Sequence, residues 1–240
     1  MRLWIWLCAL LLASPLAAEP WYVVGDDQFA PYSFLTADDD TPRGLDVELV
    51  GAVMREAGQD YRLRLYPWAR VKQMLERREV KMAFQFAGTP ERRGQYELAG
   101  PLRTGRTVFM VNRSVALEDW KTLTDFEPYV IGQVRGYAYE EAFDKADLRR
   151  DSSASNPRQL VSMLLAGRIA VIVGDRDQLL YFAREQRAEA QVRVLPTPLV
   201  EMPRYVAFAK GDTAPAQQFS EALERLRQRG ALEEILRRWR

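Results

Sequence analysis

Apolar runs alternate with segments of helical spacing from residue 21 onward. The runs at 21–24 and 80–86 predict buried strands, and the alternation of basic and apolar residues at 62–66 predicts another. Apolar residues recur at helical spacing in 49–58, which a glycine closes, and in 68–75. A third helix is expected after the last of these strands. The order strand, helix, strand, helix, strand, helix predicts an α/β layer with a parallel sheet.

A second unit of the same kind follows in the rest of the chain. A helix begins at Asn156-Pro157 and stops at Gly167, as the capping and stop residues there indicate. Helical spacing resumes at Thr213 and continues past an interruption at Gly230 to the end. The strands expected in this part are 107–112, 129–134, 169–173, 192–195 and 204–209.

The first 18 residues have the composition of a cleavable secretory signal peptide. Arg2 provides a short basic start, 3–13 is apolar but too short to span a bilayer comfortably, and 14–18 supplies small residues for cleavage. We expect cleavage near Ala17 or Ala18, and we exclude this segment from the fold.

The composition excludes several kinds of catalytic group and metal site. The chain has no histidine and one cysteine, Cys8, which lies in the predicted signal peptide. Disulfides, thiol nucleophiles, histidine bases and zinc sites with cysteine or histidine ligands are therefore excluded after cleavage, and we expect no metal and no cofactor. Export without disulfides fits a bacterial periplasm. With 34 basic and 33 acidic residues, nothing indicates nucleic-acid binding.

The strongest local site signal is the segment 86–93, which follows a predicted strand. Thr89 is placed to cap a helix, and Pro90 fits the first helical position. Arg92 would then lie in the first turn, at the strand edge where α/β sheets bind ligands. Backbone N–H groups and a guanidinium suit a carboxylate there. The alternative is a surface arginine on a capped helix.

Other candidates follow predicted strands as well. In the loop after 21–24, Asp26 precedes Phe29 and Tyr32, whose rings could stack on a ligand or fill the core. Asp175 comes directly after the strand at 169–173, where it could bind a ligand or only cap the next helix.

Two more residues stand at the start of the helix at 68–75. Core packing is the simplest interpretation of Trp68, and Arg70 could be solvated or point into a cleft.

Five local patterns occur in a recognisable order. They are Phe29-Ala-Pro31-Tyr32, Gly44-Leu-Asp-Val-Glu-Leu49, Thr89-Pro-Glu-Arg92 with Pro101, Gly167-Arg-Ile-Ala-Val-Ile-Val-Gly-Asp175, and Phe208-Ala-Lys210-Gly211 with Trp239. Together they resemble the bacterial extracellular solute-binding proteins of family 3, the periplasmic receptors that feed polar amino-acid ABC transporters. The resemblance covers essentially the whole chain after the signal peptide.

The resemblance implies a two-lobed α/β fold of the periplasmic-binding-protein type, with two parallel-sheet lobes. Lobe 1 would hold 20–108 and 206–240, and lobe 2 would hold 109–205. Two crossing strands, at 107–112 and 205–209, would join them.

The resemblance also assigns roles to the ends of an α-amino acid. Arg92 would hold the ligand carboxylate, helped by the Thr89 hydroxyl, and Asp175 from the other lobe would accept the ammonium. Phe29 and Trp68 would sandwich the ligand side chain.

Three further positions complete the implied site. Asp26 would bind the polar end of the ligand side chain. Gly136 and Tyr137 would form the second-lobe loop that closes over the ligand. Tyr137 is bulky where the family commonly has a small residue, and Arg70 departs from its usual acidic pattern. These departures leave open a small anion other than an amino acid.

The implied function is capture of a small polar solute, an amino acid or small carboxylate, by a monomer in the periplasm. Hinge closure would bury the solute, and an inner-membrane ABC permease would recognise the closed form. Two alternatives stay open: an enzyme resembling the periplasmic cyclohexadienyl dehydratases, and a ligand-sensing module for a membrane signalling partner.

Overall fold

The computed structural model describes residues 19–36, 38 and 40–239. The predicted signal peptide lies outside these residues. Within them, no helix combines the length and the apolar character needed to cross a membrane.

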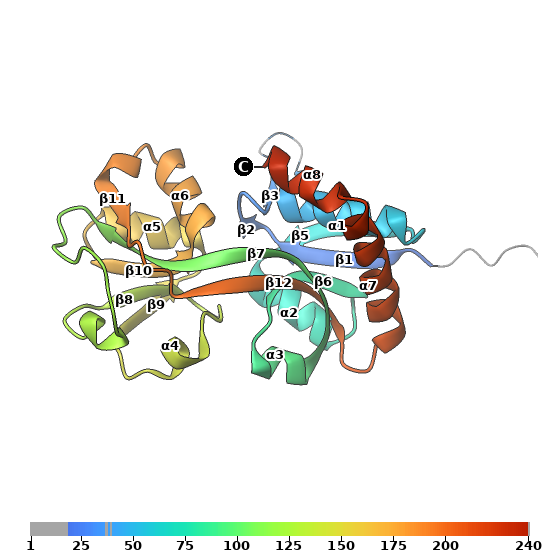
Figure 1. Cartoon of the computed structure of the whole chain (residues 1–240), viewed down its shortest axis with the longest axis horizontal. Coiled ribbons are helices and arrows are strands. Elements are labelled where there is room, and N and C mark those ends of the chain that lie inside the picture. The colour runs from blue at the N-terminus through green and yellow to red at the C-terminus, as the bar shows by residue number, and fades with distance from the viewer. Residues whose placement is uncertain (1–18, 37, 39, 240) are drawn as a thin grey trace, which may run out of the picture.

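Two lobes are built on one nine-stranded sheet whose order is β5-β1-β6-β12-β7-β10-β8-β9, with β11 paired to β7 (Figure 1). One lobe contains β1 (Trp21–Asp26), β5 (Tyr61–Tyr66) and β6 (Met82–Ala87). The other contains β8 (Ile131–Val134), β9 (Arg150–Ala154), β10 (Val171–Asp175) and β11 (Val192–Val194). β7 (Tyr96–Asn112) and β12 (Val200–Ala209) run through both lobes.

Lobe 1 has helices on both faces of its part of the sheet (Figure 1). They are α1 (Leu45–Glu56), α2 (Trp68–Glu76), α3 (Pro90–Gln95), α7 (Thr213–Gln228) and α8 (Ala231–Arg238). The stripe of α1 predicted from its spacing, including Leu49 and Val53, is fully buried against Phe84 and Phe219 in one core cluster. β1 runs parallel to both β5 and β6, as the alternating pattern predicted.

Lobe 2 repeats this construction on a smaller scale. β8 runs parallel to β10 and to β9. Its helices are α4 (Glu141–Lys145), α5 (Pro157–Leu165), α6 (Arg176–Glu185) and the short 3₁₀ turns η1 (Leu123–Phe126) and η2 (Glu189–Gln191). Asn156 caps α5 by accepting a hydrogen bond from the Gln159 N–H at 2.9 Å, so the helix begins where its cap was predicted.

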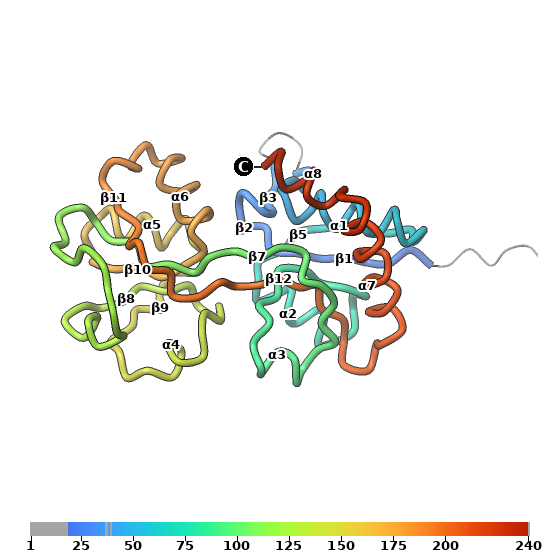
Figure 2. The backbone as a smooth tube through the Cα atoms, in the orientation of Figure 1, coloured from blue at the N-terminus to red at the C-terminus, as the bar shows by residue number. Residues whose placement is uncertain are grey.

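The crossing between the lobes lies a few residues from its expected position. Residues 107–111 already pair with β10 inside lobe 2, and 204–207 pair with β6 inside lobe 1. The span consists of 103–107 paired with 200–204 (Figure 2). Only the apolar ends of these long strands were recognisable in the sequence, because the span itself is rich in polar residues.

A small sheet of β2 (Gln28–Phe29), β3 (Ser33–Leu35) and β4 (Pro42–Arg43) was not predicted. Its strands are too short to carry a period, and it folds the segment after β1 back toward lobe 2 (Figure 1). The predicted two-lobed α/β architecture is confirmed.

Candidate ligand site between the lobes

A small cavity lies where the two lobes meet. Its lining combines residues of lobe 1, of the turn after β8 and of β12: Asp26, Phe29, Trp68, Gln85, Arg92, Tyr137, Ala138 and Arg204. Its volume of about 10 Å³ is that of about one water molecule. Five predicted site residues meet here, and three lining residues, Gln85, Ala138 and Arg204, were not predicted.

Arg92 reaches the cavity from the first turn of α3. The Thr89 side chain caps this helix by accepting a hydrogen bond from the Arg92 N–H at 3.3 Å, and Pro90 occupies the first turn. The Arg92 side chain is buried, and its guanidinium carbon lies 5.4 Å from the Trp68 ring centroid and 5.3 Å from that of Phe86.

No side-chain hydrogen bond or ion pair is made by Arg92 within the described part of the chain. Burial, and then the positive charge of Arg204, lower the pKa of Arg92 to about 10. The group is therefore still a cation at neutral pH. A buried cation without a partner is costly, and an anion entering the cavity would relieve that cost.

Arg204 lies on β12 opposite Arg103 of β7. Its side chain is buried, and its guanidinium carbon is 5.5 Å from the Phe29 ring centroid. Its Nε has no hydrogen-bond partner in the part of the chain that the structure describes. Burial lowers the pKa of Arg204 as well. Sequence reasoning missed this residue because its segment shows only the start of an apolar strand.

Tyr137 enters the cavity from lobe 2. Gly136 adopts φ 76°, a left-handed conformation that glycine accepts without strain, and the turn it makes points Tyr137 at lobe 1. The Tyr137 hydroxyl donates a hydrogen bond to Asp26 Oδ2 at 2.8 Å. Its ring meets those of Phe29 and Trp68 edge-on, with centroids 6.0 and 6.4 Å away. Tyr137 thus occupies the space between the two aromatic residues expected to hold a ligand side chain.

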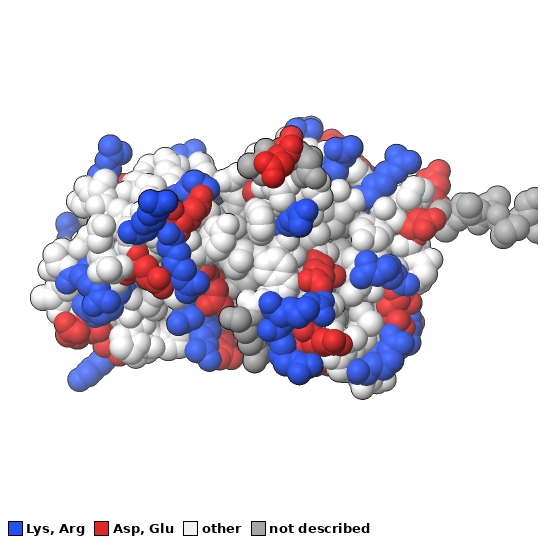
Figure 3. Space-filling model, turned by 90° about the horizontal axis from the view of Figure 1, so that it is seen from above, with Lys and Arg blue, Asp and Glu red and all other residues white. Residues whose placement is uncertain are grey.

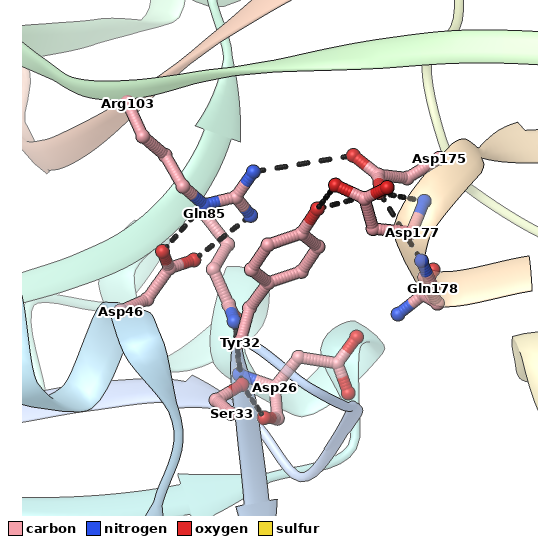
Figure 4. Close-up of polar contacts among 9 residues, drawn as sticks. All are labelled: Asp26, Tyr32, Ser33, Asp46, Gln85, Arg103, Asp175, Asp177 and Gln178. Atoms are coloured by element: carbon pink, nitrogen blue, oxygen red, sulfur yellow. Dashed lines mark hydrogen bonds and ion pairs between the residues drawn. The ribbon is translucent and has the colours of Figure 1, made fainter. Parts of the chain in front are cut away.

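Asp26 is 3% exposed, and burial raises its pKa to about 6. Its Oδ1 accepts a hydrogen bond from the Gln28 N–H at 3.0 Å. Its own N–H donates to Gln85 Oε1 at 2.9 Å, and Gln85 in turn donates to the Ser33 hydroxyl (Figure 4). Gln85 has φ 76°, a strained conformation for a non-glycine residue of the kind found at binding sites.

Asp175 does not line this cavity. Its Oδ1 accepts hydrogen bonds from the Asp177 and Gln178 N–H groups of α6 and from the Tyr32 hydroxyl, the last at 2.8 Å (Figure 4). Its Oδ2 lies 3.9 Å from Arg103 Nη1. The predicted ammonium acceptor is therefore both a helix cap and part of a contact between the lobes.

Arg103 completes that contact. It forms a two-point ion pair with Asp46 of α1, at 2.6 and 3.1 Å, and its guanidinium carbon lies 3.3 Å from the Tyr32 ring centroid. Asp46, Tyr32, Arg103 and Asp175 are all buried. We call these four residues the interlobe network.

The remaining predicted residues lie outside the cavity lining. Thr89 acts as the cap of α3, and Tyr32 belongs to the interlobe network. Arg70 is exposed, with its guanidinium carbon 4.5 Å from the Tyr66 ring centroid. In the described residues, no group of three or more acidic, cysteine or histidine side chains could hold a metal ion.

Comparisons with known proteins agree with this architecture. Residues 22–240 match the family described as bacterial extracellular solute-binding proteins, family 3. The chain is similar to the L-cystine-binding protein TcyA of Bacillus subtilis, with 19% identity over 88% of this chain and 77% of that protein.

Solved structures of the same fold include a sensor domain and a binding protein. A histidine kinase sensor domain with similarity to periplasmic binding proteins superposes with a TM-score of 0.83 and 22% identity, covering 93% of this chain and 96% of that one. The arginine-, lysine-, histidine-binding protein ArtJ of Geobacillus stearothermophilus gives 0.79 and 22%, covering 92% and 95%.

Proposed function

Because the chain belongs to the bacterial extracellular solute-binding proteins of family 3, we propose that it captures a small carboxylate-bearing solute, foremost an α-amino acid, between its lobes. The observation that carries the proposal is Arg92, a buried cation that lines the interlobe cavity and has no ion-pair partner among the described residues. A bound carboxylate would give it the two parallel hydrogen bonds that a guanidinium fork favours.

Binding requires the lobes to separate first. The cavity of about 10 Å³ cannot hold an amino acid, and Tyr137 fills the space between Phe29 and Trp68. Bending at the span between the lobes would withdraw Tyr137 and uncover Asp26, Phe29 and Arg92. Closure over the ligand would then exclude water, which strengthens each ionic contact inside.

We propose that the closed, loaded form is presented to an inner-membrane ABC permease in the periplasm, after export by the N-terminal signal peptide. The likeness of TcyA, a cystine-binding protein, supports an amino-acid ligand. On the face shown in Figure 3, basic and acidic side chains are interspersed on both lobes. The cavity arginines differ from these surface charges in being buried without an ion-pair partner among the described residues.

A second candidate is ligand sensing. The superposition on a histidine kinase sensor domain at a TM-score of 0.83 favours it. Transport and sensing would use the same ligand site and would differ in the membrane protein that binds the closed form. Co-purification with a permease or with a kinase from membranes would separate them.

The test is calorimetry on the purified protein, unfolded and refolded to remove carried-over solute, against amino acids and small carboxylates. Arg92→Ala should weaken binding of the best solute at least tenfold, as loss of a desolvated charged contact does. Arg93→Ala is the matched control, because its neighbouring guanidinium is exposed and bonds Tyr205 at 2.9 Å. Equal affinities in all three proteins would refute the site.

A further inference from the structure

From the cavity's unbalanced charge we infer that Arg204 is a second ligand-binding arginine and that the solute carries two carboxylate groups. The inference rests on the proposed function and narrows the solute to one chemical class. No local motif of the sequence assigns Arg204 a role.

Arg204 has the position of a ligand contact. It is 9% exposed and lines the same cavity as Arg92. Its Nε is buried without a partner, and it makes no ion pair within the described residues. The next residue on the strand, Tyr205, does not line the cavity, and its hydroxyl accepts a hydrogen bond from the exposed Arg93. At this point of the strand, the guanidinium at the cavity is that of Arg204.

Arg103 shows how this chain treats a buried arginine that has a structural role. It is the partner of Arg204 across the strand pair and is also buried, but it holds Asp46 by two hydrogen bonds and lies near Asp175. Although Arg103 Nη1 makes no hydrogen bond within the described residues, the chain provides acidic partners for this arginine, which serves the fold. Within the described residues, it provides none at ion-pair distance from Arg92 or Arg204.

The charges of the cavity lining do not balance. The lining contains two arginines and a single carboxylate, Asp26. Asp26 is engaged with Tyr137 and makes no ion pair with either arginine. The positive charge of Arg204 acts on Arg92, and two like charges so placed favour an anion between them. One carboxylate would satisfy Arg92, and a second would satisfy Arg204, whose cationic form is otherwise favoured only by more distant groups, Asp175 first.

A solute with two carboxylates matches this arrangement. Each guanidinium would take one carboxylate in a two-point contact. Asp26, released when Tyr137 withdraws, would be free to accept an ammonium group. An acidic amino acid would therefore use all three charges, and a dicarboxylate without an ammonium would use the two arginines with Asp26 protonated.

The experiment compares L-glutamate and L-aspartate with their amides, L-glutamine and L-asparagine, by calorimetry on the refolded protein. Each pair differs by one carboxylate at nearly constant shape. We expect the acid to bind about 10- to 100-fold more tightly than its amide, the range for a charged hydrogen bond. Succinate and glutarate test whether the ammonium contributes. Equal binding of the acids and their amides would overturn the inference without any mutation.

A second experiment measures the same affinities in the variant Arg204→Gln. This variant should bind the acid and the amide about equally, with its affinity for the amide unchanged. Arg92→Ala should weaken binding of both the acid and the amide. Arg106→Gln is the control, because this arginine lies on the same span with its side chain 64% exposed. A preference retained in Arg204→Gln would overturn the role of Arg204.

The arms also separate the two proposals. Tight binding of an amino acid with one carboxylate, sensitive to Arg92→Ala and indifferent to Arg204→Gln, would sink the two-carboxylate inference and leave the proposed function standing. Absence of binding to every amino acid and carboxylate, by a protein with a cooperative thermal transition, would refute both.

Discussion

Replacing Tyr137 by alanine should make solute binding tighter. This side chain crosses from lobe 2 into lobe 1 and occupies the space between Phe29 and Trp68. Its hydroxyl holds Asp26. A solute must displace all of these interactions, so their free energy counts against binding. Tyr137→Ala removes that competition and leaves both aromatic rings and Arg92 in place.

The interactions of the Tyr137 side chain set the magnitude of this effect. A hydrogen bond to a charged group contributes about 1.5–3 kcal/mol, and each aromatic pair about 0.5–1.5 kcal/mol. One such hydrogen bond and two ring pairs therefore stabilise the arrangement with Tyr137 between the rings by about 2.5 kcal/mol at the lower end. Affinity should rise by about 70-fold in Tyr137→Ala. Tyr137→Phe keeps the ring pairs and removes only the bond to Asp26, so we expect a rise of about tenfold.

Calorimetry with the best solute measures the affinities. Tryptophan fluorescence in a variant that keeps Trp68 and has phenylalanine at Trp21, Trp120 and Trp239 provides an independent signal of withdrawal of the tyrosine. Thermal unfolding without solute should show a lower melting temperature in Tyr137→Ala, because an interlobe contact is gone. Unchanged or weaker binding in this variant would contradict the reasoning. It would mean that Tyr137 serves the bound state rather than the empty one.

Three further predictions concern the surroundings of the cavity. Burial raises the pKa of Asp26 to about 6 from 3.8, so between these two pH values the folded protein binds a proton that the unfolded chain releases. The free energy of unfolding should therefore fall by about 3 kcal/mol as the pH rises from about 4 to about 7; urea titrations should show this contribution missing in Asp26→Asn. Asp46→Asn leaves Arg103 with a broken buried ion pair and should cost about 3–5 kcal/mol of stability. An unchanged urea midpoint would argue against this pair. A Cβ at Gly105 would overlap Asp175 Oδ2, so Gly105→Ala should loosen the contact between the lobes. Small-angle scattering of this variant without added solute should show a larger radius of gyration. An unaltered scattering profile would count against a role of Asp175 in holding the lobes together.

Local signals in the sequence were sufficient to predict most elements and the position of Arg92 in the first turn of a capped helix. Thr89, Pro90 and Arg92 lie within a single helical turn, and capping depends on hydrogen bonds between residues three apart. The alternation of apolar runs and helical spacing determined the α/β order, because each element buries one face regardless of its distant partners.

Only the tertiary structure decided which side chains fill the junction of the lobes and which charges line its cavity. Arg204 lines the cavity because β12, which pairs with both β6 and β7, carries it to the junction of the lobes, and no single segment encodes that strand pairing. Asp175 is held by Tyr32 and Arg103 from the other lobe and from the span. The sequence determined which side chains stand at strand ends. The contacts between lobes, which join residues more than 100 positions apart, determined which of them line the cavity.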